Sequence, residues 1–196
     1  SRVEAGLDIV VEREIVQSFV RSMGSICVPR GRIVGGETVA RAGFLVRQVG
    51  SEALVPTVLI AGRDFRLDDK LRVLHREINA LFIQQSQLEL KLKYLSTPRR
   101  LPMIRPGSPG NEDMAQLKQQ LDDAVRRIQV LTAEAEDLKL QSQCNTRARL
   151  EILKVVYPES YLRLAEEELH VREQFPGPVH AHLAGGKVHL RKGNED

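Results

Sequence analysis

Apolar residues in the first third of the chain follow a short repeat. Gly6, Gly24 and Gly43 recur at spacings of 18 and 19 residues, and Ile15-Val16 returns as Ile33-Val34. Turn residues separate short β-branched runs such as Ile9-Val10-Val11, Ile26-Cys27-Val28 and Leu45-Val46. Short strands at a fixed period predict the stacked coils of a β-helix over residues 1–66. The alternative is an ordinary meander whose turns fall at this spacing by coincidence.

The hydrophobic period changes at residue 67. Apolar residues then alternate at spacings of four and three, interrupted only by Gln85, which is typical of a coiled-coil seam. This first seam contains Leu67, Leu71, Leu74, Ile78, Leu81, Leu88, Leu92 and Leu95. A second contains Met114, Leu117, Leu121, Ala124, Ile128, Leu131, Ala135 and Leu138. Two helices of matching length joined by a turn are expected to pack antiparallel.

Four prolines lie between the two seams, in residues 96–112. Because proline cannot continue a helix, this stretch is predicted to be a loop. Residues 143–196 return to the alternation of strands, as in Leu150-Glu151-Ile152. The sequence therefore predicts a mixed β and α fold, a single-stranded parallel (right-handed) β-helix with an inserted long antiparallel coiled-coil hairpin. Its three parts are coils at 1–66, the hairpin at 67–142 and returning strands at 143–196.

Composition and charge narrow the function classes. Aromatic residues make up only 4% of the chain, which is low for an aromatic-lined ligand site. The formal net charge is +3 and no region is one-sidedly basic, so we expect no nucleic-acid partner. No apolar run is long enough for a transmembrane segment. The first residues already follow a strand pattern, which is what we expect for a fragment of a longer protein. Cys27 and Cys144 are interpreted as free thiols of a reducing compartment.

One segment resembles a known family. It runs from Gly31-Arg32-Ile33-Val34-Gly35-Gly36 to Ala40, and continues with Gly50-Ser51 and Thr57 to Gly62. Together with Ala5 to Val11 and the return segment Val155-Val156-Tyr157-Pro158, it is similar to the C-terminal part of the flagellar assembly protein A family. The family pattern leads us to expect Gly after that proline, where this chain has Glu159. The resemblance implies a bacterial cytoplasmic protein linked to flagellar assembly and motility, acting through protein contacts.

Two motifs suggest chemistry that the surrounding residues do not support. Gly31-x-x-x-Gly35-Gly36 lacks the Lys and hydroxyl of a phosphate-binding loop, and Glu37 would repel phosphate, so these glycines are interpreted as coil corners. His180 and His182, with His170 and His189, could bind zinc, but no Cys or closely spaced acid accompanies them. No nucleophile with a matching base stands out. We expect no catalytic residue, no metal and no cofactor.

The loop between the helices contains the best candidate for a contact site. Its basic and apolar residues interleave, a composition suited to docking a protein partner. They are Arg99, Arg100, Leu101, Met103, Ile104 and Arg105. The alternative is a solvated turn with a few apolar residues tucked onto the helix ends.

Three functions compete. The first is a non-catalytic scaffold whose partners are proteins, with a homo-oligomer as one option. The second is an acyltransferase-like enzyme on a left-handed hexapeptide β-helix. This reading is disfavoured because Arg21 interrupts the apolar series and residues 1–66 contain no histidine. The third is a bactofilin-like cytoskeletal polymer, whose end-to-end stacking the inserted hairpin would complicate.

Overall fold

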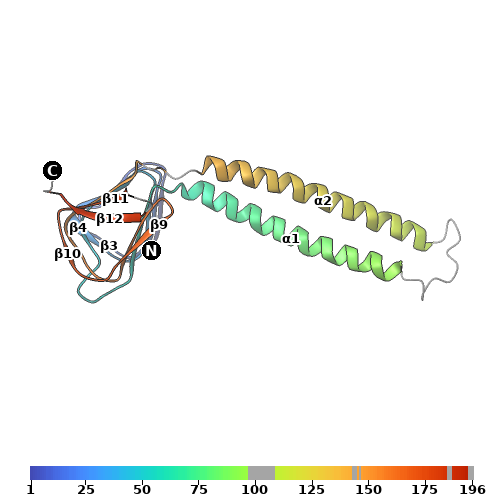
Figure 1. The fold of residues 1–196 in the computed structure, drawn as a ribbon, viewed down its shortest axis with the longest axis horizontal. Coiled ribbons are helices and arrows are strands. Elements are labelled where there is room, and N and C mark those ends of the chain that lie inside the picture. The colour runs from blue at the N-terminus through green and yellow to red at the C-terminus, as the bar shows by residue number, and fades with distance from the viewer. Residues whose placement is uncertain (97–108, 143–144, 146, 185–186, 194–196) are drawn as a thin grey trace. The chain divides into compact units, whose positions relative to one another are not determined.

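The computed structural model describes residues 1–96, 109–142, 145, 147–184 and 187–193. The chain divides into two compact units (Figure 1). The sheet unit is formed by Ser1–Asp68 and Ser142–Asp196, and the helical unit by Asp69–Gln141. The fold is therefore of the mixed β and α class, as predicted.

The strands of the sheet unit belong to one large sheet, in which twelve strands lie within the described residues. Six precede the helices: β1 (Arg2–Ala5), β2 (Ile9–Val10), β3 (Glu14–Ser22), β4 (Ser25–Ala40), β5 (Gly43–Val49) and β6 (Thr57–Ala61). Six follow them: β7 (Arg149–Val156), β8 (Ser160–Leu164), β9 (Glu167–Val171), β10 (Phe175–Pro176), β11 (Val179–Ala184) and β12 (Lys187–Lys192). The strand order along the main path is β12-β11-β7-β5-β4-β6-β8-β9.

Parallel pairing places like side chains over one another inside the sheet unit. β4 pairs in parallel with β2 and β3 on one side and with β5 and β6 on the other. Val28, Val46 and Ile152 stand in register on successive strands, and none of the three is exposed to solvent. This match of register and burial explains why the short β-branched runs recur along the sequence: each run supplies one level of the same apolar column.

A buried polar column follows one corner of the sheet. Ser18, Gly36, Thr57 and Ser160 stand in register across β3, β4, β6 and β8. The Thr57 hydroxyl donates to the Val55 carbonyl at 2.9 Å and accepts from the Gly35 amide at 2.8 Å. Gly36 has a φ of 80°, and a Cβ there would lie 2.3 Å from the Ser18 carbonyl oxygen, so only glycine fits. The pair Gly35-Gly36 is thus a turn within β4 at a strand corner.

The C-terminal strands depart from the parallel pattern. β7 and β8 pair in parallel with β5 and β6, but β9 is antiparallel to β8, and β11 is antiparallel to both β7 and β12. The expectation that all returning strands continue a parallel β-helix is therefore wrong for β9 to β12. Residues 165–166 form a short turn between β8 and β9, and so short a turn can join only antiparallel neighbours.

The two ends of the helical insertion meet at the sheet. The chain leaves after β6 and returns before β7, where Gly43 pairs with Arg149 and Phe44 with Leu150. The Asn145 amide donates to the Gly62 carbonyl at 2.8 Å, and its side chain donates to the Arg41 carbonyl at 3.2 Å. Asn145 thus fastens the returning chain beside the point of departure.

The helical unit consists of α1 (Phe65–Leu95), whose first residues belong to the sheet unit, and α2 (Pro109–Gln141). Leu74 and Leu138 line one hollow between the helices, whereas Leu95 and Leu117 line another. The helices therefore run antiparallel and side by side (Figure 1). Leu74, Ile78, Leu131 and Ala135 form the buried cluster between them. The predicted seam residues are buried or half-buried except Leu95, which is 38% exposed.

The predicted loop at residues 96–112 is too long. α2 already begins at Pro109, because a proline in the first helical turn needs no amide hydrogen and has a suitable φ. Residues 97–108 lie outside the described part of the chain. Within the described residues, no helix is long and apolar enough to cross a membrane.

Replacing Leu131 with Asp is expected to lower the free energy of unfolding of the helical unit by about 3 kcal/mol or more. The side chain is 2% exposed, so the substitution removes apolar contacts and buries a charge. Leu140→Asp is the control, because Leu140 is 67% exposed, and its effect should stay within about 0.5 kcal/mol. Thermal unfolding followed by far-UV circular dichroism measures both variants. Equal thermal midpoints for the two variants would contradict the assignment of Leu131 to the buried seam.

Candidate functional site

The residues of the predicted contact site lie outside the described part of the chain. They are Arg99, Arg100, Leu101, Met103, Ile104 and Arg105, all within the segment 97–108. The helices that precede and follow this segment are both described.

The four histidines considered for zinc do not converge on one point. His180 and His182 lie on β11 and His189 on β12, where the rings of His182 and His189 are 6.0 Å apart and tilted. His170 lies on β9 and stacks on Tyr161 instead. Among the described residues, no group of three or more His, Cys, Asp and Glu side chains is placed to hold a metal ion.

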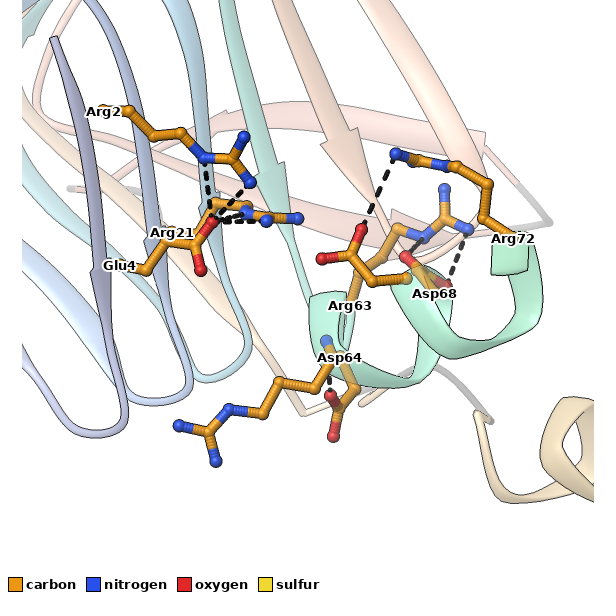
Figure 2. Close-up of polar contacts among 9 residues, drawn as sticks. Arg2, Glu4, Arg21, Arg63, Asp64, Asp68 and Arg72 are labelled. Atoms are coloured by element: carbon orange, nitrogen blue, oxygen red, sulfur yellow. Dashed lines mark hydrogen bonds and ion pairs between the residues drawn. The ribbon is translucent and has the colours of Figure 1, made fainter. Parts of the chain in front are cut away.

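Several polar contacts gather at the start of α1. Asp64 caps the helix, since its Oδ1 accepts from the amides of Arg66 at 3.1 Å and Leu67 at 3.3 Å. Arg63 lies 3.2 Å from the Asp68 carboxylate and Arg41 lies 3.7 Å from that of Asp64. Figure 2 shows Arg63, Asp64 and Asp68 around this first turn. The two carboxylates interact favourably with the positive, N-terminal end of the helix dipole, and the arginines balance their negative charge.

Phe65 fixes this first turn to the sheet. Its ring is 5% exposed and packs against Val39 and Ile60. The Arg21 guanidinium lies 4.6 Å above the ring centroid, a cation–π contact. Arg21 and Arg2 both donate to Glu4 Oε1, with the Arg2 nitrogens at 2.7 and 3.0 Å (Figure 2). The hydrogen bonds from Arg21 and then Arg2 hold the pKa of Glu4 below its ordinary value. A carboxylate held in this way is a structural partner and a poor proton acceptor.

A second polar cluster surrounds Glu159. This residue has a φ of 59°, the left-handed conformation for which the family pattern had led us to expect glycine. The Tyr161 hydroxyl donates to Glu159 Oε2 at 3.2 Å, and His170 Nε2 lies 3.5 Å from Oε1. The Tyr161 and His170 rings are parallel, with centroids 4.4 Å apart. Desolvation and the Glu159 carboxylate raise the pKa of Tyr161. Glu159 thus retains the turn and adds contacts that glycine would not provide.

The one cysteine with a described environment is poorly suited to nucleophilic chemistry. Cys27 is a free, half-buried thiol on β4, in register with Val10 and Leu45. Burial, with a smaller effect from the Asp8 carboxylate, raises its pKa. A raised pKa lowers the fraction of reactive thiolate. Cys144 lies outside the described residues.

A surface that the sequence analysis missed follows α1 outside the buried seam. Val73, Ala80, Ile83, Leu90 and Tyr94, which we call the outer stripe, follow one another at spacings of seven, three, seven and four residues. All five are exposed, with Val73 at 59%, Ile83 at 62% and Leu90 at 66%. A helix with a second apolar face is expected to bury it against something. The signal was present in the sequence, as a second heptad series offset from the first.

One family model matches nearly the whole chain. It is described as the Flagellar Assembly Protein A beta solenoid domain and matches residues 1–188. No curated protein and no solved structure matches the chain.

Arg21→Gln should raise the pKa of Glu4 toward the ordinary value of a glutamate, because it removes the largest cause of the depression. A pH titration of the Glu4 carboxyl carbon by NMR measures this. Since the folded-state pKa is lowered, the pair stabilises the fold above the unfolded-state pKa, and this contribution is lost as the pH falls through the folded value. Arg32→Gln, which removes the partner of Glu14, is the control and should leave Glu4 unchanged.

Glu159→Gly should leave the sheet unit at least as stable as the wild type, whereas Glu159→Ala should destabilise it. The glycine variant relieves about 1 kcal/mol of strain in the left-handed backbone conformation. This gain offsets the loss of the contacts of the Glu159 carboxylate, which are partly exposed and contribute at most about 1 kcal/mol. Alanine keeps the strain and loses the contacts. Urea unfolding followed by tyrosine fluorescence ranks the variants. An alanine variant more stable than the glycine variant would refute this account of the turn.

Proposed function

We propose that this chain, which belongs to the Flagellar Assembly Protein A beta solenoid domain family, serves bacterial flagellar assembly as a non-catalytic scaffold acting through protein contacts. The observation that carries the proposal is the family match over residues 1–188, which includes both the strands and the helices. Its partners in this proposal are proteins, and its location is the cytoplasm, where the Cys27 thiol stays reduced.

The finer architecture is part of the same proposal. The parallel strands would wind as a right-handed β-helix, and the two helices would form a coiled-coil hairpin inserted between β6 and β7. Parallel registers of 17 and 18 residues, as in Val3 with Val20 and Ile15 with Ile33, support one coil per repeat. The antiparallel hairpins β8–β9 and β11–β12 argue against a polymer built by parallel end-to-end stacking, because they replace the parallel edge that the next subunit would extend.

The loop between the helices remains our proposed docking point for a protein partner. α1 has 31 residues, which corresponds to about 46 Å of helix. Ordering such a helical pair costs conformational entropy. The core of a β-sheet does not require such a pair. A contact surface presented at the far end of the pair would explain its retention. Residues 99–105 combine three arginines with apolar side chains, the composition of an anchor with charged flanks.

Replacing residues 99–105 with a Gly/Ser linker is expected to abolish motility in a complementation assay while leaving the circular dichroism spectrum unchanged. The assay uses a deletion strain of a flagellated bacterium that encodes this protein. The control replaces Lys118, Arg126 and Lys139 on α2 with Ser, since it removes the same number of positive charges from exposed positions. Normal motility of the linker variant would show that the loop is only a turn.

A further inference from the structure

The outer stripe on α1 is an interface that the scaffold role does not require. Its members lie outside the buried cluster and remain exposed, although Val73 lines one hollow with Leu138 of α2, and Leu90 and Tyr94 line another with Leu117. The stripe extends from Val73 to Tyr94, about 32 Å along the helix. Solvated helix faces normally carry charged and polar side chains, and on this face only Arg76 and Gln87 interrupt the apolar residues. We propose that the outer stripe binds the same stripe of a second copy of the chain, antiparallel about a two-fold axis.

The apolar residues of the stripe complement themselves under such an axis. With the axis near residue 85, Leu90 of one copy faces Ala80 of the other, and Ile83 faces Gln87. A large side chain opposite a small one allows two helices to approach closely. Leu90 and Ile83 are 66% and 62% exposed in the single chain, so the pairing removes much apolar surface from water.

The charges beside the stripe match when each flank is centred within one residue of the same axis, at residue 84 on one flank and at residue 86 on the other. Arg76 faces Tyr94 of the second copy, where a guanidinium can lie over the ring. Glu77 and Lys91 lie on the same flank of the stripe and are placed symmetrically about residue 84, so each meets the other across the axis. Glu77 already accepts a hydrogen bond from Arg127 at 3.1 Å, and a carboxylate has room for a further donor. On the opposite flank Lys93 meets Asn79, so no like charges are brought together there.

These matches favour a second copy over an unrelated partner. In a two-fold interface both copies contribute the same patch, so every residue of the patch must be compatible with the residue that faces it in the other copy. An acid near one end of the stripe and a lysine near the other meet this requirement for an antiparallel pair. A parallel pair would instead place Glu77 against Glu77 and Lys91 against Lys91.

The first test is the mass of the full chain in solution, measured by sedimentation equilibrium over a wide range of concentrations. We expect a reversible dimer of twice the 22.0 kDa of one chain. Leu90→Glu should weaken dimerisation at least about tenfold. Leu140→Glu is the matched control, because Leu140 lies on α2 and is 67% exposed against 66% for Leu90, and it should leave the dimer intact. Both side chains are exposed, so both variants should keep the wild-type helix content.

The second test concerns the orientation. Lys91→Glu should weaken the dimer because it places two glutamates opposite each other, and adding Glu77→Lys should restore it. Failure of the double variant to recover would overturn the antiparallel register. A monomer at every concentration, or a dimer that Leu90→Glu leaves unchanged, would overturn the proposal itself. The docking role of the loop is tested by motility and the dimer by sedimentation equilibrium. Because these are separate measurements, either proposal can fail while the other holds.

Discussion

Each parallel strand of the sheet unit buries its inward face because the next strand places a similar side chain directly over it. Val28, Val46 and Ile152 meet in this way, as do Ile15, Ile33, Val49 and Val156. A slip of one residue would turn such a column toward solvent, so the register is strongly determined. The polar corner of Ser18, Gly36, Thr57 and Ser160 reinforces the same register, since only a glycine fits beside the Ser18 backbone. The helices and the polar clusters are attached to this stack.

Charged side chains are held in mutual pairs at two places on the sheet unit. Around the first turn of α1, the Asp64 carboxylate caps the helix and arginines pair with Asp64 and Asp68, while Arg21 joins Glu4 to the Phe65 ring. The Glu159 cluster is arranged similarly, with a carboxylate between a hydroxyl and an imidazole. Paired charges of this kind fix turns and helix starts.

The sequence predicted those features that depend on local periodicity. The change of period near Leu67 located both helices, because heptad spacing is a property of consecutive residues. The 18-residue repeat predicted parallel stacking before the helices for the same reason. The antiparallel pairing of β9 to β12 was missed because alternation along a strand is identical in both orientations. The early start of α2 at Pro109 was missed because proline was interpreted only as a breaker, although it suits a first turn. The outer stripe was overlooked because one seam sufficed to explain α1.

The meeting of the two insertion ends has a consequence for how the chain folds. Phe44 and Leu150 are neighbours in the core although more than a hundred residues separate them in sequence, and closing so long a loop in an extended chain is entropically costly. Helices form from local contacts on a much faster timescale than distant strands pair. Once α1 and α2 have paired, the chain between Gly62 and Asn145 behaves as a short, stiff connection. We therefore expect early pairing of the two helices to shorten the loop that must close before the late strands can join the sheet.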